Sequence, residues 1–349
     1  MIGITIFLHI IVIYLGLPVQ AAETPCNNLE YQATSSEAYT DAGEFGFSPD
    51  ASGVENAKAL QQAIDQGGTI IVSKPGIYKI ATSLYIGSNT SLIFGNGVSL
   101  KKVNEAGLFA QLIINKGAMT RTYDDHISVE GLHVIVNGID NCSDLVLGLR
   151  GILGFSYVKD LKIKGFRCYD LTGCQYGLQV NRFEDVIIED VIIKGQKDGI
   201  HFGPGKRFTI RDAVFQTLDD AIALNAQDYS TSNPEMGWIE DGLIENCYDL
   251  NQEKMIGFFC RLLGGGWIDW KEGMTVQQSD AVVSNGRIYR VKMPSNGKLY
   301  KSLTRPDFES GSKVLDGITW VMTQEEVTYT AGVRNVIFRN IHLEKPRVA

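Results

Sequence analysis

The sequence repeats a short pattern about every 22 residues, and this repeat restricts the folds available to the chain. Each unit has a polar residue followed by alternating apolar residues. The first apolar position of successive units falls at Leu92, Ile127, Leu161, Val186, Phe208, Gly242 and Val336. Units of this length that contain only strands are typical of a parallel β-solenoid. A sandwich or a propeller would need closely spaced hairpin turns or a longer period, so we expect an all-β parallel β-helix.

A second short strand recurs within the units. It begins at Tyr176, Asp198 and Asp220, which follow one another at intervals of 22 residues. Because equivalent residues of neighbouring coils stack at a strand spacing of about 4.8 Å, Asp198 is expected to lie above Asp220. Asp219 occupies the neighbouring position. Stacked carboxylates repel each other and raise at least one pKa, which favours a catalytic role. A turn that caps backbone amides, or a calcium site, would use the same residues.

A short helix precedes the repeats. Residues 55–66 place Leu60, Ala63 and Ile64 on one face, and Gly67 and Gly68 follow. This pattern predicts a helix that ends at the glycines and caps a β-helix spanning residues 41–267.

The repeat is interrupted at residues 268–323. Ser284–Arg287 contains Asn-Gly, which favours a tight hairpin turn. We expect a small antiparallel β module here, inserted before the β-helix continues over residues 324–349. The last strand, Asn335–Leu343, has no capping element after it, so the expected β-helix is incomplete at this end.

The N-terminus predicts export. An apolar run ends at Pro18 and small residues follow at Val19–Ala21, so residues 1–21 are expected to be a cleaved signal peptide. The mature protein would be secreted, extracellular or periplasmic, monomeric and free of the membrane. The net charge of −8, without a basic block, argues against nucleic acid as a partner.

The six cysteines show no spacing that suggests zinc. Cys168 and Cys174 could close a small disulfide loop, whereas Cys247 and Cys260 are expected to pack as small buried side chains. Disulfides are compatible with an exported protein.

Several phrases resemble a known family. Phe45–Gly46, Ala63–Asp65 and Pro75–Tyr78 resemble the opening of right-handed parallel β-helix proteins related to pectin-degrading enzymes. Gln196–Gly199 and Leu218–Ala223 resemble the catalytic phrases Asn-Thr-Asp-Gly and Gly-Asp-Asp-Cys-Ile-Ala of the family 28 glycoside hydrolases, the polygalacturonases.

This resemblance implies inverting hydrolysis of glycosidic bonds in a pectin-like or other acidic polysaccharide, without a cofactor. Asp219 would be the general acid, and Asp198 and Asp220 would hold the attacking water. Inversion requires acid and base about 6.5–9.5 Å apart.

The chain departs from the family around this site. The family's His-Gly is absent from the next coil, which reads Glu253–Phe258, and its Arg-x-Lys motif is not found before Ala349. Candidate substrate-binding residues are Lys197, His201, Lys254, Arg261 and Tyr176.

The inserted module resembles small chitin- and cellulose-binding domains. Trp270, Tyr289 and Trp320 are its candidate sugar-stacking residues, although core packing of a small domain explains the same aromatics.

Two other functions remain open. A polysaccharide lyase of the same fold would use Ca²⁺ and an Arg or Lys base. A non-catalytic β-helix protein would bind glycan through its loops and the inserted module.

Overall fold

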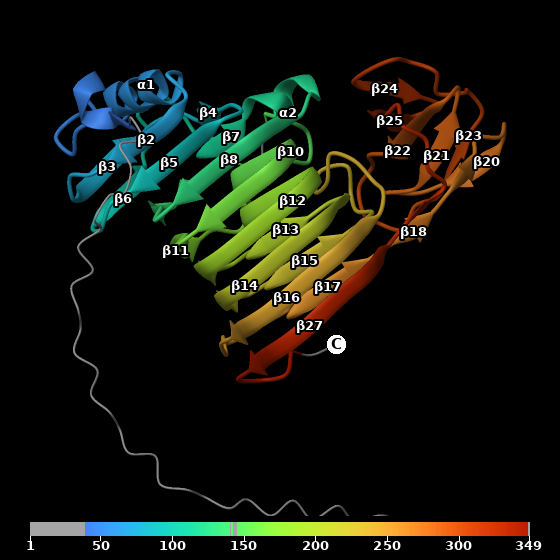
Figure 1. Ribbon diagram of the computed structural model, residues 1–349. Coiled ribbons are helices and arrows are strands. Elements are labelled where there is room, and N and C mark those ends of the chain that lie inside the picture. The colour runs from blue at the N-terminus through green and yellow to red at the C-terminus, as the bar shows by residue number, and fades with distance from the viewer. Residues whose placement is uncertain (1–38, 140, 142–144, 348–349) are drawn as a thin grey trace, which may run out of the picture. The chain divides into compact units, whose positions relative to one another are not determined.

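The computed structural model describes residues 39–139, 141 and 145–347 (Figure 1). The expected signal peptide, Cys26 and Cys142 lie outside the described residues. Within the described residues, 18 strands form one large parallel sheet that winds through successive coils. The fold is a right-handed parallel β-helix, as expected.

The strands of the β-helix form three stacks, and the longer strands bend from one stack into the next. The first stack contains β4 (Leu84–Ile86), β7 (Ile113–Asn115), the start of β10 (Gly151–Lys164), the start of β12 (Tyr176–Gly195), β13 (Ile200–Phe202), β15 (Ile222–Asn225) and β17 (Cys260–Leu263). The second contains β1 (Tyr39–Asp41), β2 (Gly68–Val72), β5 (Thr90–Phe94), β8 (Asp124–Glu130), the middle of β10 and β12, and the starts of β14 (Gly205–Thr217), β16 (Ile239–Asp249) and β27 (Val333–Leu343). The third contains β3 (Gly76–Ile80), β6 (Val98–Lys102), β9 (His133–Ile135), β11 (Arg167–Leu171) and the ends of β12, β14, β16 and β27.

The strand register confirms most of the predicted alignment. The structure pairs Ile127, Leu161, Val186, Phe208, Gly242 and Val336 in sequence across neighbouring strands. Leu92 was wrongly aligned, because it pairs with Val129 while Thr90 pairs with Ile127. Thr90 is buried and takes the inward position that the pattern assigned to an apolar residue.

The polar residue that begins each repeat marks a corner of the coil. Asp185, Arg207, Asp241 and Asn335 all have a positive φ between 56° and 59°. Aspartate and asparagine enter this left-handed region more readily than most other residues. The side-chain amide of Asn335 donates to Asp241 Oδ1 at 3.1 Å, so the corner residues also bond from coil to coil.

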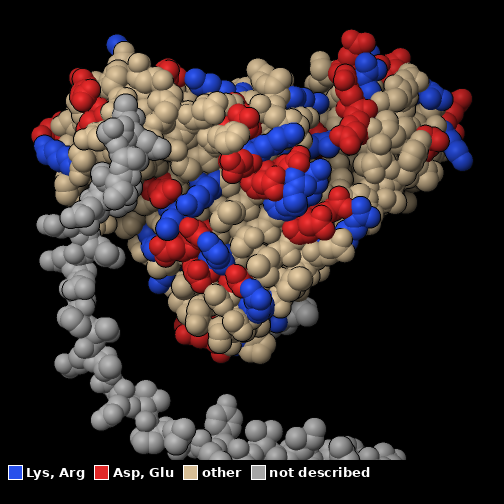
Figure 2. Space-filling model, in the orientation of Figure 1, with Lys and Arg blue, Asp and Glu red and all other residues tan. Residues whose placement is uncertain are grey.

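The interior of the coils is apolar, and the outer face of the second stack is charged. Figure 2 shows acidic and basic side chains interleaved across this face. Arg207 contacts Glu184, and Arg339 contacts Glu245 on the neighbouring coil. Opposite charges on adjacent strands stabilise their pairing modestly.

Helix α1 (Gly53–Ile64) is the predicted capping helix, and Leu60, Ala63 and Ile64 lie in the core as expected. Ser52 and Glu55 form a capping box at its start. A short helical turn, η1 (Ala42–Phe45), and helix α2 (Lys116–Thr120) were not predicted. Over the described ranges, no helix has the length and apolar character needed to cross a membrane.

The repeat is interrupted by a β module, as predicted. Its strands are β19 (Ile268–Asp269), β20 (Met274–Val276), β21 (Ala281–Ser284), β22 (Arg287–Val291), β23 (Tyr300–Ser302), β24 (Ser312–Leu315) and β25 (Ile318–Gln324). Two short strands, β18 (Gly265–Gly266) and β26 (Thr330–Ala331), pair antiparallel where the chain enters and leaves it. Ser284 pairs with Arg287 across the predicted hairpin turn.

The three aromatic residues proposed for sugar stacking lie in the core of this module. Trp270, Tyr289 and Trp320 are buried among Val276, Val282, Val291, Ile318 and Met322. A buried ring has no face available to a sugar. This placement corrects the expectation that they form exposed platforms, and core packing accounts for them.

The disulfide bond considered between Cys168 and Cys174 is not present in the structure. Cys168 is a free, buried thiol, whereas Cys174 is disulfide-bonded, so these two residues do not pair with each other. Cys247 and Cys260 are also free.

Candidate active site

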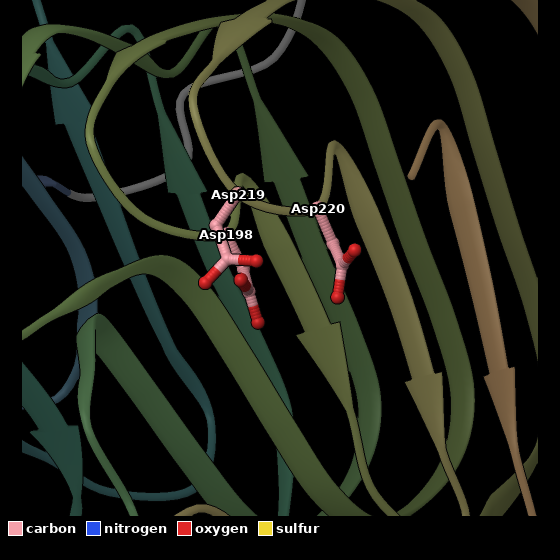
Figure 3. Close-up of side chains that lie close together, drawn as sticks. All are labelled: Asp198, Asp219 and Asp220. Atoms are coloured by element: carbon pink, nitrogen blue, oxygen red, sulfur yellow. The ribbon is translucent and has the colours of Figure 1, made fainter. Parts of the chain in front are cut away.

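Asp198, Asp219 and Asp220 lie at the start of neighbouring strands of the first stack (Figure 3). The backbone N–H of Gly199 donates to the Asp220 carbonyl at 2.9 Å, which places Asp198 and Asp220 on adjacent coils as predicted. One carboxylate oxygen from each of the three residues lies within 4.8 Å of the others. The 22-residue repeat therefore gathers three acids at one point.

Asp198 is only 3% exposed and is held from one side. Its Oδ2 lies 2.8 Å from Nδ1 of His201. Its Oδ1 is buried and accepts no hydrogen bond from the described residues. Because buried carboxylate oxygens are nearly always partnered, Oδ1 is the atom of this site that is available to a water molecule or a ligand.

His201 and Tyr176, both predicted to bind substrate, lie behind Asp198. Their rings stack with centroids 4.3 Å apart, and both side chains are buried. His201 Nε2 faces Oδ1 of Asn233 at 3.1 Å. This position suits residues that orient Asp198, because neither ring is exposed to a polymer.

Asp220 is buried and keeps a raised pKa. Burial, and next the negative charge of Asp198, raise the pKa of Asp220 to about 6. Two contacts act in the opposite direction: the backbone N–H of Phe258 donates to Oδ1 at 2.7 Å, and Arg261 Nη1 lies 3.9 Å from Oδ2. Asp220 therefore holds a proton in mildly acidic conditions.

Asp219 is the acid that solvent reaches most easily, with 20% of its side chain exposed. Lys197, a predicted substrate-binding residue, contacts Oδ2 of Asp219 through its ammonium group. The Thr217 hydroxyl donates to the Asp219 carbonyl at 3.0 Å, and this hydrogen bond helps to fix the turn that carries the acids.

Arg347 also supports this turn, and no pattern in the sequence indicated this role. Its Nη1 donates to the Asp219 carbonyl at 2.5 Å. Its Nε and Nη2 donate to the two oxygens of Asp249 at 2.6 and 2.7 Å. Both side chains of this ion pair are buried. Such bidentate contacts fix orientation as well as charge.

Arg261 and Lys254 lie in the next coil. Arg261 lines a cavity of about 350 Å³ together with Tyr229 and Leu263. The module completes its wall with the polar residues Gln277, Gln278, Ser279 and Ser295. Lys254 lies exposed in the loop before β17. Arg261 thus lies against Asp220, whereas Lys254 forms no ion pair with the described residues.

The separation of the carboxylates differs from the expectation for an inverting enzyme. Their nearest oxygens lie within 4.8 Å, whereas inverting enzymes generally hold acid and base about 6.5–9.5 Å apart. Asp198 and Asp220 are buried, whereas Asp219 is partly exposed to solvent.

Residues 226–238, which we call the covering loop, were not recognised in the sequence as part of the site. This loop connects β15 to β16 and contains Asn233. Arg290 of β22 donates to three of its carbonyls. The one indication in the sequence was Arg290, which lies between Tyr289 and Val291 in a predicted strand of the module.

Comparison with known proteins gives structural matches only. No protein-family model matches the chain. No curated protein matches it either. A family 28 exopolygalacturonase from Yersinia enterocolitica is 16% identical with a TM-score of 0.49; the match covers 67% of this chain and 52% of that protein. The chain thus spans about half the length of this enzyme.

Two further structures illustrate the range of these matches. A hyperthermoactive exopolygalacturonase from Thermotoga maritima is 11% identical with a TM-score of 0.44, covering 67% of this chain and 72% of that one. PfbA, a surface adhesin of Streptococcus pneumoniae, is 15% identical with a TM-score of 0.45, covering 62% and 63%.

Proposed function

We propose that this protein is a secreted enzyme that hydrolyses glycosidic bonds in an acidic polysaccharide. The observation that carries the proposal is the group of three carboxylates with nearest oxygens within 4.8 Å, one of which has its pKa raised to about 6. A site with both protonated and ionised carboxyl groups supplies the acid and the base that glycoside hydrolysis requires.

Each acid has an environment suited to one step. Asp219, the most exposed, protonates the leaving oxygen while the bond between that oxygen and the anomeric carbon breaks. Water attacks the anomeric carbon and gives its proton to Asp198, whose Oδ1 is unpartnered among the described residues. Asp220, whose pKa is raised, holds the proton that passes to Asp219 before the bond breaks, and the proton that Asp198 takes from water returns to Asp220; this modifies the water-activating role first expected for Asp220.

Cationic side chains support an acidic substrate. Lys197 and Arg261 flank the carboxylates, and Arg261 faces the cavity of about 350 Å³. The amides and hydroxyls that the module contributes to this cavity are suitable partners for sugar hydroxyls. In this proposal the module contacts substrate through this polar wall and not through its aromatic residues.

The test is the Asp219→Asn variant on polygalacturonate. It should release no reducing ends while its unfolding transition matches that of the wild type. Asp212→Asn serves as the control. Asp212 lies at an exposed corner of a coil, so this variant should retain activity. Unchanged turnover by Asp219→Asn would contradict the assignment of Asp219 as the general acid.

One observation favours a second candidate, a cation-dependent lyase. Three carboxylate oxygens within 4.8 Å could also surround a cation, and Asp198 Oδ1 has no hydrogen-bond partner among the described residues. The ammonium group of Lys197 against Asp219 opposes this, because it already supplies a positive charge there. Loss of activity in chelator, with an unsaturated product that absorbs in the ultraviolet, would favour the lyase.

A further inference from the structure

The covering loop packs over two outward-facing side chains of the first stack and shields them from solvent. Gln179 Nε2 donates to the carbonyl of Ser232 at 2.8 Å, and His201 Nε2 faces Asn233 Oδ1 at 3.1 Å. Gln179 and His201 are both fully buried beneath this loop. The position of the loop therefore decides what His201 can contact.

Asn233 fixes the hydrogen-bonding direction of His201. Nδ2 of Asn233 donates to the carbonyl of Asn225, and because a carbonyl only accepts, Oδ1 is the atom that faces His201. Nε2 of His201 then carries a hydrogen. On the other side of the ring, one proton is shared with Asp198, either on Nδ1 or on the carboxyl group. The ring is thus held between Asn233 and Asp198.

The module holds the covering loop in place. The guanidinium of Arg290 is buried and donates to the carbonyls of Asp228, Asn233 and Pro234 at 2.9, 2.6 and 2.9 Å. Its remaining hydrogen bond goes to Thr323 Oγ1 at 3.2 Å. Burial lowers the pKa of Arg290 more than the negative charges of Asp228 and Glu235 raise it, so this arrangement is better suited to specifying the loop's position than to adding stability.

We propose that Arg290 is a positioning residue for the carboxylate site. It holds the covering loop so that Asn233 orients His201 and His201 orients Asp198, which makes the inserted module a structural part of the site. The inference rests on the proposed hydrolase function for its kinetic consequence, although the chain of contacts can be tested without turnover.

Kinetics test the consequence. Arg290→Lys keeps the charge but one ammonium group cannot reproduce a planar fork that contacts three carbonyls. Its kcat for polygalacturonate should fall about tenfold or more, the effect expected for losing hydrogen bonds to a charged group. KM should stay within about threefold, because Arg290 contacts no substrate. Arg287→Lys, on the same strand and paired with Glu309 within the module, should leave both constants unchanged.

A double-mutant cycle separates this pathway from general damage. Asn233→Ala should give a similar loss of kcat, and the double variant should be no worse than the poorer single variant if both act through His201. Additive losses, or a raised KM with unchanged kcat in Arg290→Lys, would overturn the proposal.

Proton NMR gives a readout that does not depend on activity. The wild type should show hydrogen-bonded ring N–H signals of His201, assigned by their loss in His201→Gln, and these should shift or disappear in Arg290→Lys and in Asn233→Ala. If the wild type cleaves no glycan, the proposed function fails while this arm still decides the inference. His201 signals that stay unchanged in both variants would refute it.

Discussion

The backbone N–H of Phe258 donates to Asp220 Oδ1 at 2.7 Å, yet the pKa of this carboxyl group is still raised to about 6. Burial outweighs the hydrogen bond, and the charge of Asp198 adds to it. The site thus keeps an ionisable group where its charge is unfavourable. Active sites commonly retain such groups at the expense of stability.

Replacing Asp220 by Asn should stabilise the protein at high pH. The unfolded chain gives up this proton near pH 4 and the folded protein near pH 6, so wild-type stability falls as pH rises between these values. Above pH 6 the loss is complete, at roughly 2–3 kcal/mol for a shift of about two pKa units. Urea unfolding of Asp220→Asn at pH 4 and pH 8 should show the difference in stability shrinking toward the acidic end.

The control for this experiment is Asp212→Asn, at an exposed corner where the next coil already has Asn246. It should change the free energy of unfolding by less than about 0.5 kcal/mol at either pH. If the difference in unfolding free energy between the wild type and Asp220→Asn is the same at pH 4 and pH 8, the raised pKa of Asp220 is contradicted.

Arg347 and Asp249 form a buried ion pair beside the turn that carries Asp219 and Asp220. Arg347→Met should destabilise the protein by about 3–5 kcal/mol, because it leaves the Asp249 carboxylate without a partner. Activity should fall as well, since the Asp219 carbonyl loses a donor. Arg339→Met removes an exposed pair with Glu245 and should cost about 0–1 kcal/mol. Denaturant titrations that give equal losses for the two variants would show that Arg347 is not a structural clamp.

Arg261 should set the preference for an acidic substrate. Arg261→Met removes the cation that lies between Asp220 and the polar cavity, so kcat/KM for polygalacturonate should fall about tenfold or more. The matched control is Lys254→Met, which removes an exposed positive charge from the loop before β17 and should have little effect. Equal losses on a neutral polysaccharide would indicate that Arg261 acts on Asp220 and not on substrate charge.

The repeated part of the chain could be predicted because successive coils place residues of the same kind at equivalent positions. Asp185, Arg207, Asp241 and Asn335 all begin a repeat and all occupy the same left-handed corner. The stacking of Asp198 on Asp220 followed from this register. The register failed at Leu92, where buried Thr90 takes the position of an apolar residue and disguises the start of the unit.

The contacts that surround the acids could not be predicted from a repeat, because they come from segments that do not repeat. Arg290 reaches Asn233 across 57 positions of sequence, and Arg347 reaches Asp219 across 128. Neither distance is related to the coil period. The buried aromatic residues of the module were misinterpreted for a related reason: a small β domain needs large side chains in its core whether or not it binds sugar.

The stereochemistry of the product tests the movement that the site requires. The resemblance to polygalacturonases implies inversion, but the nearest oxygens of the three acids lie within 4.8 Å, closer than the separation of about 6.5–9.5 Å that is usual between the acid and base of an inverting enzyme. Asp198 and Asp220 are buried, so inversion requires Asp219 to swing outward with Lys197 when sugar binds. NMR of the first products should then show the anomer opposite to that of the substrate. Retention would mean that the short separation is the working geometry, with one carboxylate acting as the nucleophile.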